Sequence, residues 1–281
     1  MNQPADTALS RVTSALRCPV CREPLRHDGT ALRCPTGHGY DIARQGYVSL
    51  LTGGSRANTG DTADQVERRQ RFLARGHYDP IASTLSDAIG DVSGLCVDAA
   101  GGTGHYLATV LASHPGLLGL NLDLSTFAAR RAARGHSRLA SVRADVWQDL
   151  PILDGQAAVV LSVFGPRNAA EIARVLRESG RLVVVTPRAD HLRELVEPLG
   201  MISVDPRKRE RLDEQLRGFT TVSHTAVHHR AAFTHADIID DVLMGPSAHH
   251  VDHDELARAV AALPEPLTVT VSVDVTGYVV Q

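Results

Sequence analysis

The sequence of 281 residues lacks any uninterrupted apolar segment of about twenty residues, the length that a membrane-spanning helix needs. Its first seventeen residues, MNQPADTALSRVTSALR, also lack the continuous apolar core and the cleavage site of a secretory signal. We therefore expect residues 1–17 to be a flexible polar leader, the chain to act in the cytoplasm, and no membrane to be among its partners.

Aromatic residues are scarce as well, at 4% of the chain, so stacking on a planar ligand would depend on few rings, among them Tyr47, Tyr78 and Phe164. The net charge of −3 excludes a uniformly basic surface, yet the charge is unevenly distributed. Residues 1–75 contain eleven Arg and seven Asp or Glu (+4), and the remainder contains eighteen basic and twenty-five acidic residues (−7). A basic module on an acidic body fits this split, although a difference of this size also arises by chance.

What is present begins with a cysteine cluster in the pattern Cys18-x2-Cys21-x12-Cys34-x3-His38. Structural zinc takes four such ligands in a tetrahedral arrangement, and paired cysteines present them from tight turns. Disulfides are unfavourable in a cytoplasmic chain, and about thirty residues rich in Arg, Gly and Pro cannot bury thiols in a core of their own. The spacing predicts one structural Zn²⁺, held by Cys18, Cys21, Cys34 and His38.

Neither Cys96 nor His27 is expected to join this site. Cys96 lies in the apolar run Leu95-Cys96-Val97 and is predicted to be a small buried hydrophobe. His27 lies between the two halves of the cluster and is predicted to be a solvated loop residue.

A strand, a glycine turn and a helix follow from residue 95, in the sequence LCVDAAGGTG and then HYLATVLASH. Glycines allow a sharp turn and a close approach to a ligand, and the helix N-terminus offers unpaired N–H groups. A nucleotide-like cofactor is therefore expected. A P-loop would need Gly-Lys-Ser/Thr, which is absent, and a dinucleotide fingerprint would need a small residue where Leu107 stands.

Acidic residues at strand ends add to this turn. Asp98 ends the first strand, and Asp123 ends the next, where its carboxylate can accept both ribose hydroxyls of an adenosyl group. The alternative for Asp123 is a cap on the helix that starts near Ser125. Asp145 follows a third strand, where the adenine edge would lie.

Strands and helices alternate from residue 95 to residue 187, which predicts a doubly wound parallel sheet. Residues 157–164 are typical of a central strand, a helix is expected to end at Gly180, and a strand to follow over 181–187. A helical insert, about 189–217, contains the basic run 207–211, which we expect to be a solvated helix face. Two β-rich runs, 219–231 and 267–280, flank a helix at 234–243 and could complete the sheet as antiparallel strands.

In this order, the patterns resemble the ribosomal RNA guanine-N1 methyltransferases of the RlmA type, and most closely the actinomycete tylosin-resistance group. The similarity spans nearly the whole chain and lies in the zinc cluster, in segments 40–51 and 60–78, in the core that ends at Thr186-Pro187 and His191, and in segments 43–48, 165–168 and 244–247.

The resemblance implies an α/β class I methyltransferase fold, Rossmann-like with a mostly parallel seven-stranded sheet, and an N-terminal zinc-ribbon-like module. The expected domains are the leader 1–17, a zinc-binding RNA-recognition module at 18–55, and an S-adenosylmethionine-dependent methyltransferase domain at 56–281 that carries the helical insert.

The resemblance also implies methyl transfer to N1 of a guanine in a 23S rRNA hairpin, helix 35, at position 748 or 745, with macrolide resistance as a consequence. A homodimer is left open. Family contacts to the cofactor carry over to Tyr78, Gly102, Thr103 and His191, and the glycine turn and strand ends add Asp98, Gly101, Gly104 and Asp123.

Guanine N1 carries a proton that must leave, so a proton acceptor is needed; Asp61, His77 and Asp145 are the candidates. From sequence alone, His77 and Tyr78 could equally form a packing element at a helix end. The chain has Ala100 where the family has glycine, and Gly165 where alanine is usual. Two alternatives stay open: a small-molecule methyltransferase with a structural zinc, and a non-catalytic RNA-binding homologue.

Overall fold

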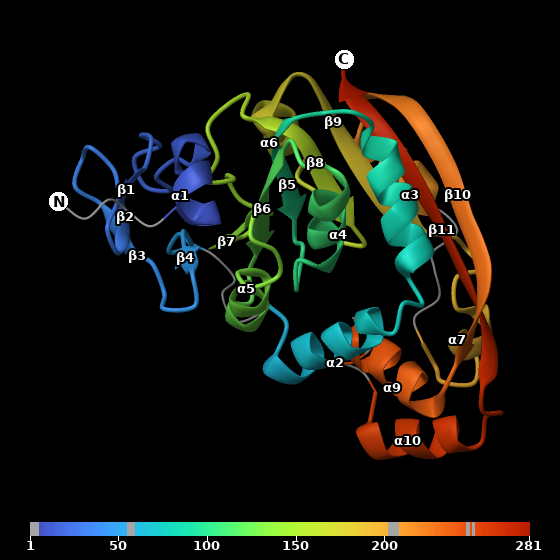
Figure 1. Cartoon of the computed structure of the whole chain (residues 1–281). Helices are drawn as coiled ribbons and strands as arrows, with labels where there is room; N and C mark the ends of the chain where they lie inside the picture. Colours follow the sequence, from blue (N-terminus) through green and yellow to red (C-terminus); the bar gives the residue numbers. More distant parts are fainter. Residues whose placement is uncertain (1–5, 55–59, 202–207, 246–247, 249–250) are drawn as a thin grey trace.

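The computed structural model describes residues 6–54, 60–201, 208–245, 248 and 251–281 (Figure 1). Parts of the expected leader, helical insert and segment 244–247 lie outside these residues. No helix in the described ranges is long and apolar enough to cross a membrane.

An eight-stranded sheet forms the centre of the molecule, in the order β10-β11-β9-β8-β5-β6-β7-β4. Strands β4 to β9 within it pair in parallel, and β11 and β10 add antiparallel strands at one edge. The expected seven strands are confirmed, and the N-terminal module contributes an eighth. The strands of this sheet are β4 (Tyr47–Ser49), β5 (Gly94–Ala99), β6 (Leu117–Asp123), β7 (Leu139–Arg143), β8 (Ala157–Val163), β9 (Leu176–Pro187), β10 (Phe219–Phe233) and β11 (Leu267–Val280).

Each face of the sheet has its own apolar core, because successive side chains of a strand point to opposite faces. Cys96 is fully buried in the core under α3 (Asp79–Ile89) and α4 (His105–Ser113), as the sequence predicted. Its neighbour Val97 is buried in the core under α1 (Ala8–Val12) and α6 (Ala169–Val175).

The expectation of a flexible leader is wrong for residues 7–17. Thr7 caps α1 through a capping box with Ser10, and the short helix η1 (Thr13–Ala15) follows. Leu9, Val12 and Leu16 are buried against the sheet at 3%, 2% and 0% exposure. These three apolar residues stand in a mostly polar segment, so burial against the sheet orders it.

The zinc module is a three-stranded antiparallel sheet followed by β4. Its strands are β1 (Arg26–Asp28), β2 (Ala31–Arg33) and β3 (Gly39–Asp41). Strand β4 pairs in parallel with β7, so the module is attached directly to the edge of the eight-stranded sheet (Figure 1).

The helix expected to reach Gly180 ends earlier. Leu176 has extended backbone angles and pairs with Ala157 of β8, so α6 stops at Val175 and β9 begins at once. The insert contains the short helix α7 (Arg193–Val196) and the helix α8 (Lys208–Gln215).

The helix α2 (Ala63–Ala74) lies across the lower part of the molecule in Figure 1 and packs against α9 (His235–Met244). Buried Asp240 of α9 receives ion pairs from Arg68, Arg71 and Arg75, at 3.3, 2.7 and 3.0 Å. α9 also packs against α10 (His253–Ala261). The remaining helix, α5 (Thr126–Ala132), lies between the zinc module and α2 (Figure 1).

Candidate active site and metal centre

The four expected zinc ligands meet at one point of the N-terminal module. The ligand atoms of Cys18, Cys21, Cys34 and His38 all lie within 4.8 Å of one another. Sγ of Cys34 is 3.3 Å from Nδ1 of His38 and 3.6 Å from Sγ of Cys21. Three sulfur donors and one nitrogen donor fit structural zinc and leave no coordination position for a substrate.

Two residues that the sequence analysis missed support these thiolates. Thr36 Oγ1 donates to Cys21 Sγ at 3.0 Å, and Tyr40 Oη lies 3.0 Å from Cys18 Sγ. Burial opposes ionisation of Cys34, but hydrogen bonds from Thr36, Cys21 and His38 outweigh it and lower the pKa of that thiol to about 6. Thr36 and Tyr40 each follow a zinc ligand by two residues, and this spacing was the only sequence signal for their role.

The glycine loop between β5 and α4 has a backbone conformation that lets a ligand approach it closely. Backbone φ is +61° at Ala100, +55° at Gly102 and +76° at Gly104, the N-cap residue of α4. A Cβ on Gly101 would lie 2.5 Å from Oδ2 of Asp98, so only glycine fits there. The loop brings together the cofactor candidates Gly101, Gly102, Thr103 and Gly104.

Asp98 lies under this loop and is fully buried. Neither of its carboxylate oxygens has a hydrogen-bond partner within the described part of the chain, and the buried hydroxyl of Tyr106 also has none. Burial and the nearby charge of Asp123 raise the pKa of Asp98 to about 7. Because unpaired buried polar groups are costly, these atoms indicate a polar ligand at the loop.

Asp123 lies on the other side of the loop. Its Oδ2 accepts the Gly102 N–H and its Oδ1 accepts the Ser125 N–H, both at 2.8 Å. Ser125, not Asp123, is the N-cap of α5, because its hydroxyl accepts from Phe127 and Ala128. The side chain of Asp123 thus touches the glycine loop, as a ribose-binding carboxylate would require.

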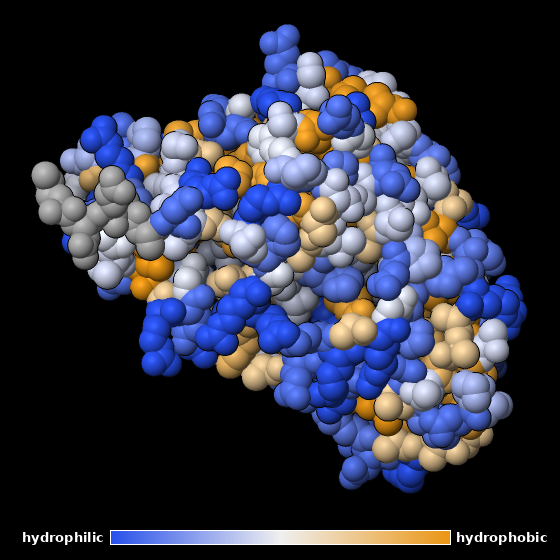
Figure 2. All heavy atoms as spheres, in the orientation of Figure 1, coloured by the Kyte–Doolittle hydropathy of each residue, from blue (hydrophilic) through white to orange (hydrophobic). Residues whose placement is uncertain are grey.

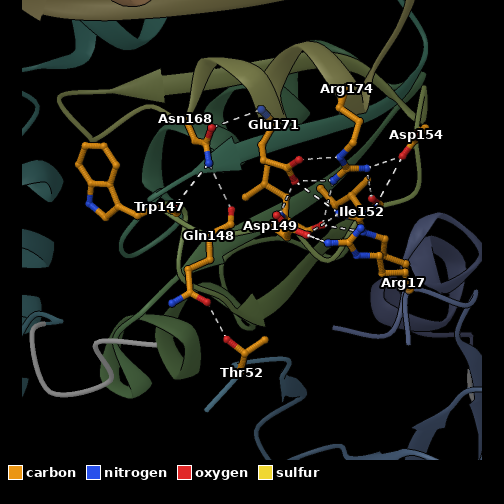
Figure 3. Close-up of polar contacts among 12 residues, drawn as sticks. Arg17, Thr52, Trp147, Gln148, Asp149, Ile152, Asp154, Asn168, Glu171 and Arg174 are labelled. Atoms are coloured by element: carbon orange, nitrogen blue, oxygen red, sulfur yellow. Dashed lines mark hydrogen bonds and ion pairs between the residues drawn. The ribbon is translucent and has the colours of Figure 1, made fainter. Parts of the chain in front are cut away.

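Asp145 lies beyond the end of β7, buried at 7% exposure, and its Oδ1 accepts the N–H of Trp147 at 3.0 Å. Asn168, which caps α6, donates to the carbonyls of Trp147 and Gln148 at 3.3 and 3.4 Å (Figure 3). The two loops that follow β7 and β8 are therefore joined next to Asp145.

Tyr78 and His191 come together although 113 positions separate them. Tyr78 Oη lies 3.4 Å from His191 Nε2, and His191 Nδ1 accepts the N–H of Ser272 at 3.1 Å. The Tyr78 hydroxyl also donates to Oδ1 of Asp241 at 3.1 Å, a residue that the sequence analysis did not single out.

Phe164 borders this pair at the end of β8. Its ring stacks on that of His191 at 6.1 Å and 17°, and it lies 6.2 Å from Tyr78 and 6.5 Å from Tyr106. Phe164 has a left-handed backbone, φ +55°, and 40% of its surface is exposed. Strained residues of this kind concentrate at functional sites, and this ring is accessible to a planar ligand.

Among the proton-acceptor candidates, Asp61 forms an ion pair with Arg69, and its carbonyl accepts from Ser125 Oγ at 2.6 Å. The Arg69 guanidinium in turn lies beside Gly102, since its Nη1 would be 3.3 Å from a Cβ there. Asp61 is therefore close to the glycine loop.

His77 has a different environment. Its ring packs 4.6 Å from Phe233 and 5.6 Å from Phe72, and its Nε2 lies 3.2 Å from Oδ1 of Asp237. These contacts match the packing role that the sequence analysis left open for His77. They hold the imidazole against α9 and β10.

Arg17, one residue before the first zinc ligand, ties the module to the catalytic domain. Its guanidinium is only 10% exposed and lies 3.6 Å from Glu171 and 3.8 Å from Asp149 and Asp154 (Figure 3). Its Nε donates to the Leu150 carbonyl at 3.2 Å. Because Glu171 belongs to the helix that Asn168 caps, this network links the metal centre to the loops beside Asp145.

The comparisons with known proteins agree with this geometry. The sequence profile of the zinc ribbon family described as RlmA, N-terminal, matches residues 16–53. A crystal structure of a Bacillus halodurans protein of the methyltransferase type has a TM-score of 0.50 at 16% identity, covering 70% of this chain and 97% of that one. That similarity shows the fold alone.

Two relatives match along almost the whole chain. The 23S rRNA (guanine(748)-N(1))-methyltransferase of Streptomyces fradiae is 46% identical, covering 94% of this chain and 96% of the relative. A Micromonospora griseorubida protein, named for the same guanine-N1 chemistry, has the same identity and the same coverage. With this identity over almost the whole chain and the matching zinc ribbon profile, the chain belongs to the RlmA-type family of 23S rRNA (guanine-N1)-methyltransferases.

Proposed function

We propose that this protein transfers the methyl group of S-adenosylmethionine to N1 of a guanine in the helix 35 hairpin of 23S rRNA. Guanine 748, the position in the name of the Streptomyces fradiae relative, is the first candidate, and 745 is the second. Modification there would protect the ribosome from macrolides, and the reaction would take place in the cytoplasm. The assembly could be a homodimer, which sedimentation would test.

The observation that carries the proposal is the set of unpaired buried polar atoms around the glycine loop. Asp98 and the Tyr106 hydroxyl offer acceptors with no protein partner in the described residues. The residues that would hold the cofactor are Tyr78, Asp98, Gly101, Gly102, Thr103, Gly104, Asp123 and His191. When bound, S-adenosylmethionine supplies an electrophilic methyl group on a sulfonium that leaves readily.

The chain itself has to position guanine and accept its N1 proton. Positioning alone supplies much of the rate, and a general base adds roughly 10²–10⁴-fold. Asp61 and Asp145 border the glycine loop and the neighbouring strand end, so they are better placed than His77, whose imidazole is packed against Phe233.

An RNA substrate is supported by a basic groove between α2 and α5. It is lined by exposed Arg130, Arg131 and Arg134 and by the half-exposed ring of Phe127, with Glu67 as the acidic residue opposite. Hydrophilic side chains dominate the lower surface in Figure 2, where Figure 1 places these helices. Both helices also border the glycine loop, since Arg69 of α2 lies beside Gly102 and Ala132 of α5 lies beside Gly104, so an RNA strand held by these arginines would reach the cofactor site.

The test is primer extension on 23S rRNA from cells with and without the gene, since an N1 methyl group blocks base pairing and stops reverse transcriptase. We expect one new stop in helix 35, absent when Asp123 is replaced by Ala. No new stop anywhere in 23S rRNA would contradict the proposal and favour a small-molecule acceptor or a non-catalytic homologue.

A further inference from the structure

Asp241 of α9 is a buried carboxylate that none of the steps above uses. It is 6% exposed and has no ion pair within the described part of the chain, whereas its neighbour Asp240 is paired with three arginines of α2. Its hydrogen bond comes from the Tyr78 hydroxyl, at 3.1 Å. The carboxyl group of Asp241 is thus buried behind a residue of the cofactor site, with no cation beside it in the described residues.

The directions of the hydrogen bonds around Tyr78 follow from the donors and acceptors present. His191 Nδ1 accepts the Ser272 N–H, so the proton of the neutral imidazole is on Nε2, which faces Tyr78 Oη at 3.4 Å. The Tyr78 O–H donates to Oδ1 of Asp241, and the His191 Nε2–H faces one of the two lone pairs of the Tyr78 oxygen. The Tyr78 oxygen is therefore left with a lone pair, and it offers an acceptor, not a proton, to a ligand.

The surroundings of this lone pair favour a cation. The charge of Arg69 acts on Tyr106, and so do those of Asp98 and Asp241. Arg69 is ion-paired with Asp61, whereas the buried carboxyl groups of Asp98 and Asp241 have no ion pair within the described residues. Burial raises the pKa of Asp241 to about 7, and the hydrogen bond from Tyr78 opposes this rise. S-adenosylmethionine has one group that matches several acceptors at once, the α-ammonium of its amino acid portion.

We propose that Asp241 is a positioning residue of the cofactor site, which holds the Tyr78 hydroxyl so that its lone pair accepts from the α-ammonium group of S-adenosylmethionine. The inference rests on the proposed function, in which Tyr78 and His191 contact the cofactor. It adds a residue of α9 to a site otherwise built from the glycine loop and strand ends.

Calorimetric titration with two ligands tests this. S-adenosylhomocysteine retains the α-ammonium, and methylthioadenosine retains the adenosine and sulfur but lacks the amino acid portion. We expect Asp241→Leu, which removes the acceptor of the Tyr78 hydroxyl at a similar side-chain shape, to weaken S-adenosylhomocysteine binding by about tenfold or more, the scale of one hydrogen bond to a charged group, and to leave methylthioadenosine binding unchanged. Tyr78→Phe should give the same pattern, and the double variant should lose little more than either single variant.

Asp240→Leu is the matched control, because it removes a buried carboxylate from the adjacent position of the same helix. It should lower the melting temperature and leave the ratio of the two affinities as in the wild type. Equal losses for both ligands in Asp241→Leu, or no loss for either, would overturn the assignment; if that variant does not fold, Tyr78→Phe decides by the same ratio. Wild-type protein that binds neither ligand would instead overturn the proposed function, and this inference with it.

Discussion

Ala100 and Gly165 stand where the resemblance leads us to expect glycine and alanine, and in the structure a side chain at residue 165 would meet Ala100. Ala100 has φ +61°, a conformation that costs a side-chain-bearing residue about 1 kcal/mol. A Cβ on Gly165 would lie 3.2 Å from the Cβ of Ala100 and 3.4 Å from the Ala99 carbonyl. The missing methyl at residue 165 makes room for the extra methyl at residue 100, so the non-catalytic alternative loses its main support.

Gly165→Ala should therefore weaken S-adenosylhomocysteine binding by about threefold to tenfold, the size of a modest packing strain. Adding Ala100→Gly should restore the affinity, because it removes both the crowding and the left-handed alanine. Titration of the two single variants, the double variant and the wild type measures this coupling. Gly53→Ala, at a site with nothing within 4 Å, is the control, and equal losses with and without Ala100→Gly would refute the pairing.

At the scale of single residues, the sequence predicts the roles of those residues whose function follows from the sequence pattern around them. The zinc ligands follow from spacing alone, and Asp98 and Asp123 follow from their places at strand ends. Asp241 could not be found in this way, because the sequence does not distinguish it from the adjacent Asp240. The two residues differ only in the partners that they contact from α9. Asp240 meets arginines of α2, and Asp241 meets Tyr78, contacts made across more than 160 positions.

Among the helices and strands, α1 is the one whose role could not be predicted from the sequence. Its five residues show too little periodicity to identify a helix, and only the contact with β6 and β7 makes it an ordered part of the core. The early end of α6 has a similar cause, since the pairing of Leu176 with Ala157 overrides a helical pattern. By contrast, the long alternating strands and helices from residue 95 were predictable from their apolar spacing.

Leu9→Ala should lower the free energy of unfolding by about 2–5 kcal/mol, because it leaves a cavity where a buried leucine packs between α1 and the sheet. Denaturant unfolding followed by circular dichroism measures the change. Arg11→Ala, on the exposed side of the same helix, should stay within about 0.5 kcal/mol of the wild type. A Leu9→Ala variant as stable as the wild type would show that α1 does not belong to the folded core.

For the whole molecule, removal of zinc separates what the metal stabilises from what the catalytic core stabilises. Metal binding supplies most of the folding free energy of so small a module, so chelation should unfold β1, β2 and β3. The glycine loop leads into α4, and the core under α3 and α4 contains no residue of the zinc module among the described residues, so S-adenosylhomocysteine affinity should change less than about threefold, whereas rRNA methylation should be lost.

Hydrogen exchange of residues 18–41, ligand titration and methylation of 23S rRNA, each before and after chelation and after zinc is restored, measure the three effects. Protection of β1 to β3 that survives chelation would show that the ribbon does not depend on the metal. A parallel loss of cofactor affinity would show instead that the Arg17 network transmits the unfolding to the glycine loop.

Strand β4 lies within the segment that matches the zinc ribbon family, and it joins two parts of the molecule: it pairs with β7 of the catalytic sheet and with Ile42 and Ala43 of the ribbon. The ribbon segment therefore cannot be exchanged without also exchanging a strand of the catalytic sheet. A chimera that takes residues up to 53 from another family member also imports the edge of the sheet next to the strand that leads to Asp145. Recombination between family members is accordingly restricted to pairs whose β4 and β7 fit each other, so the choice of RNA target and the shape of the catalytic sheet should diverge together.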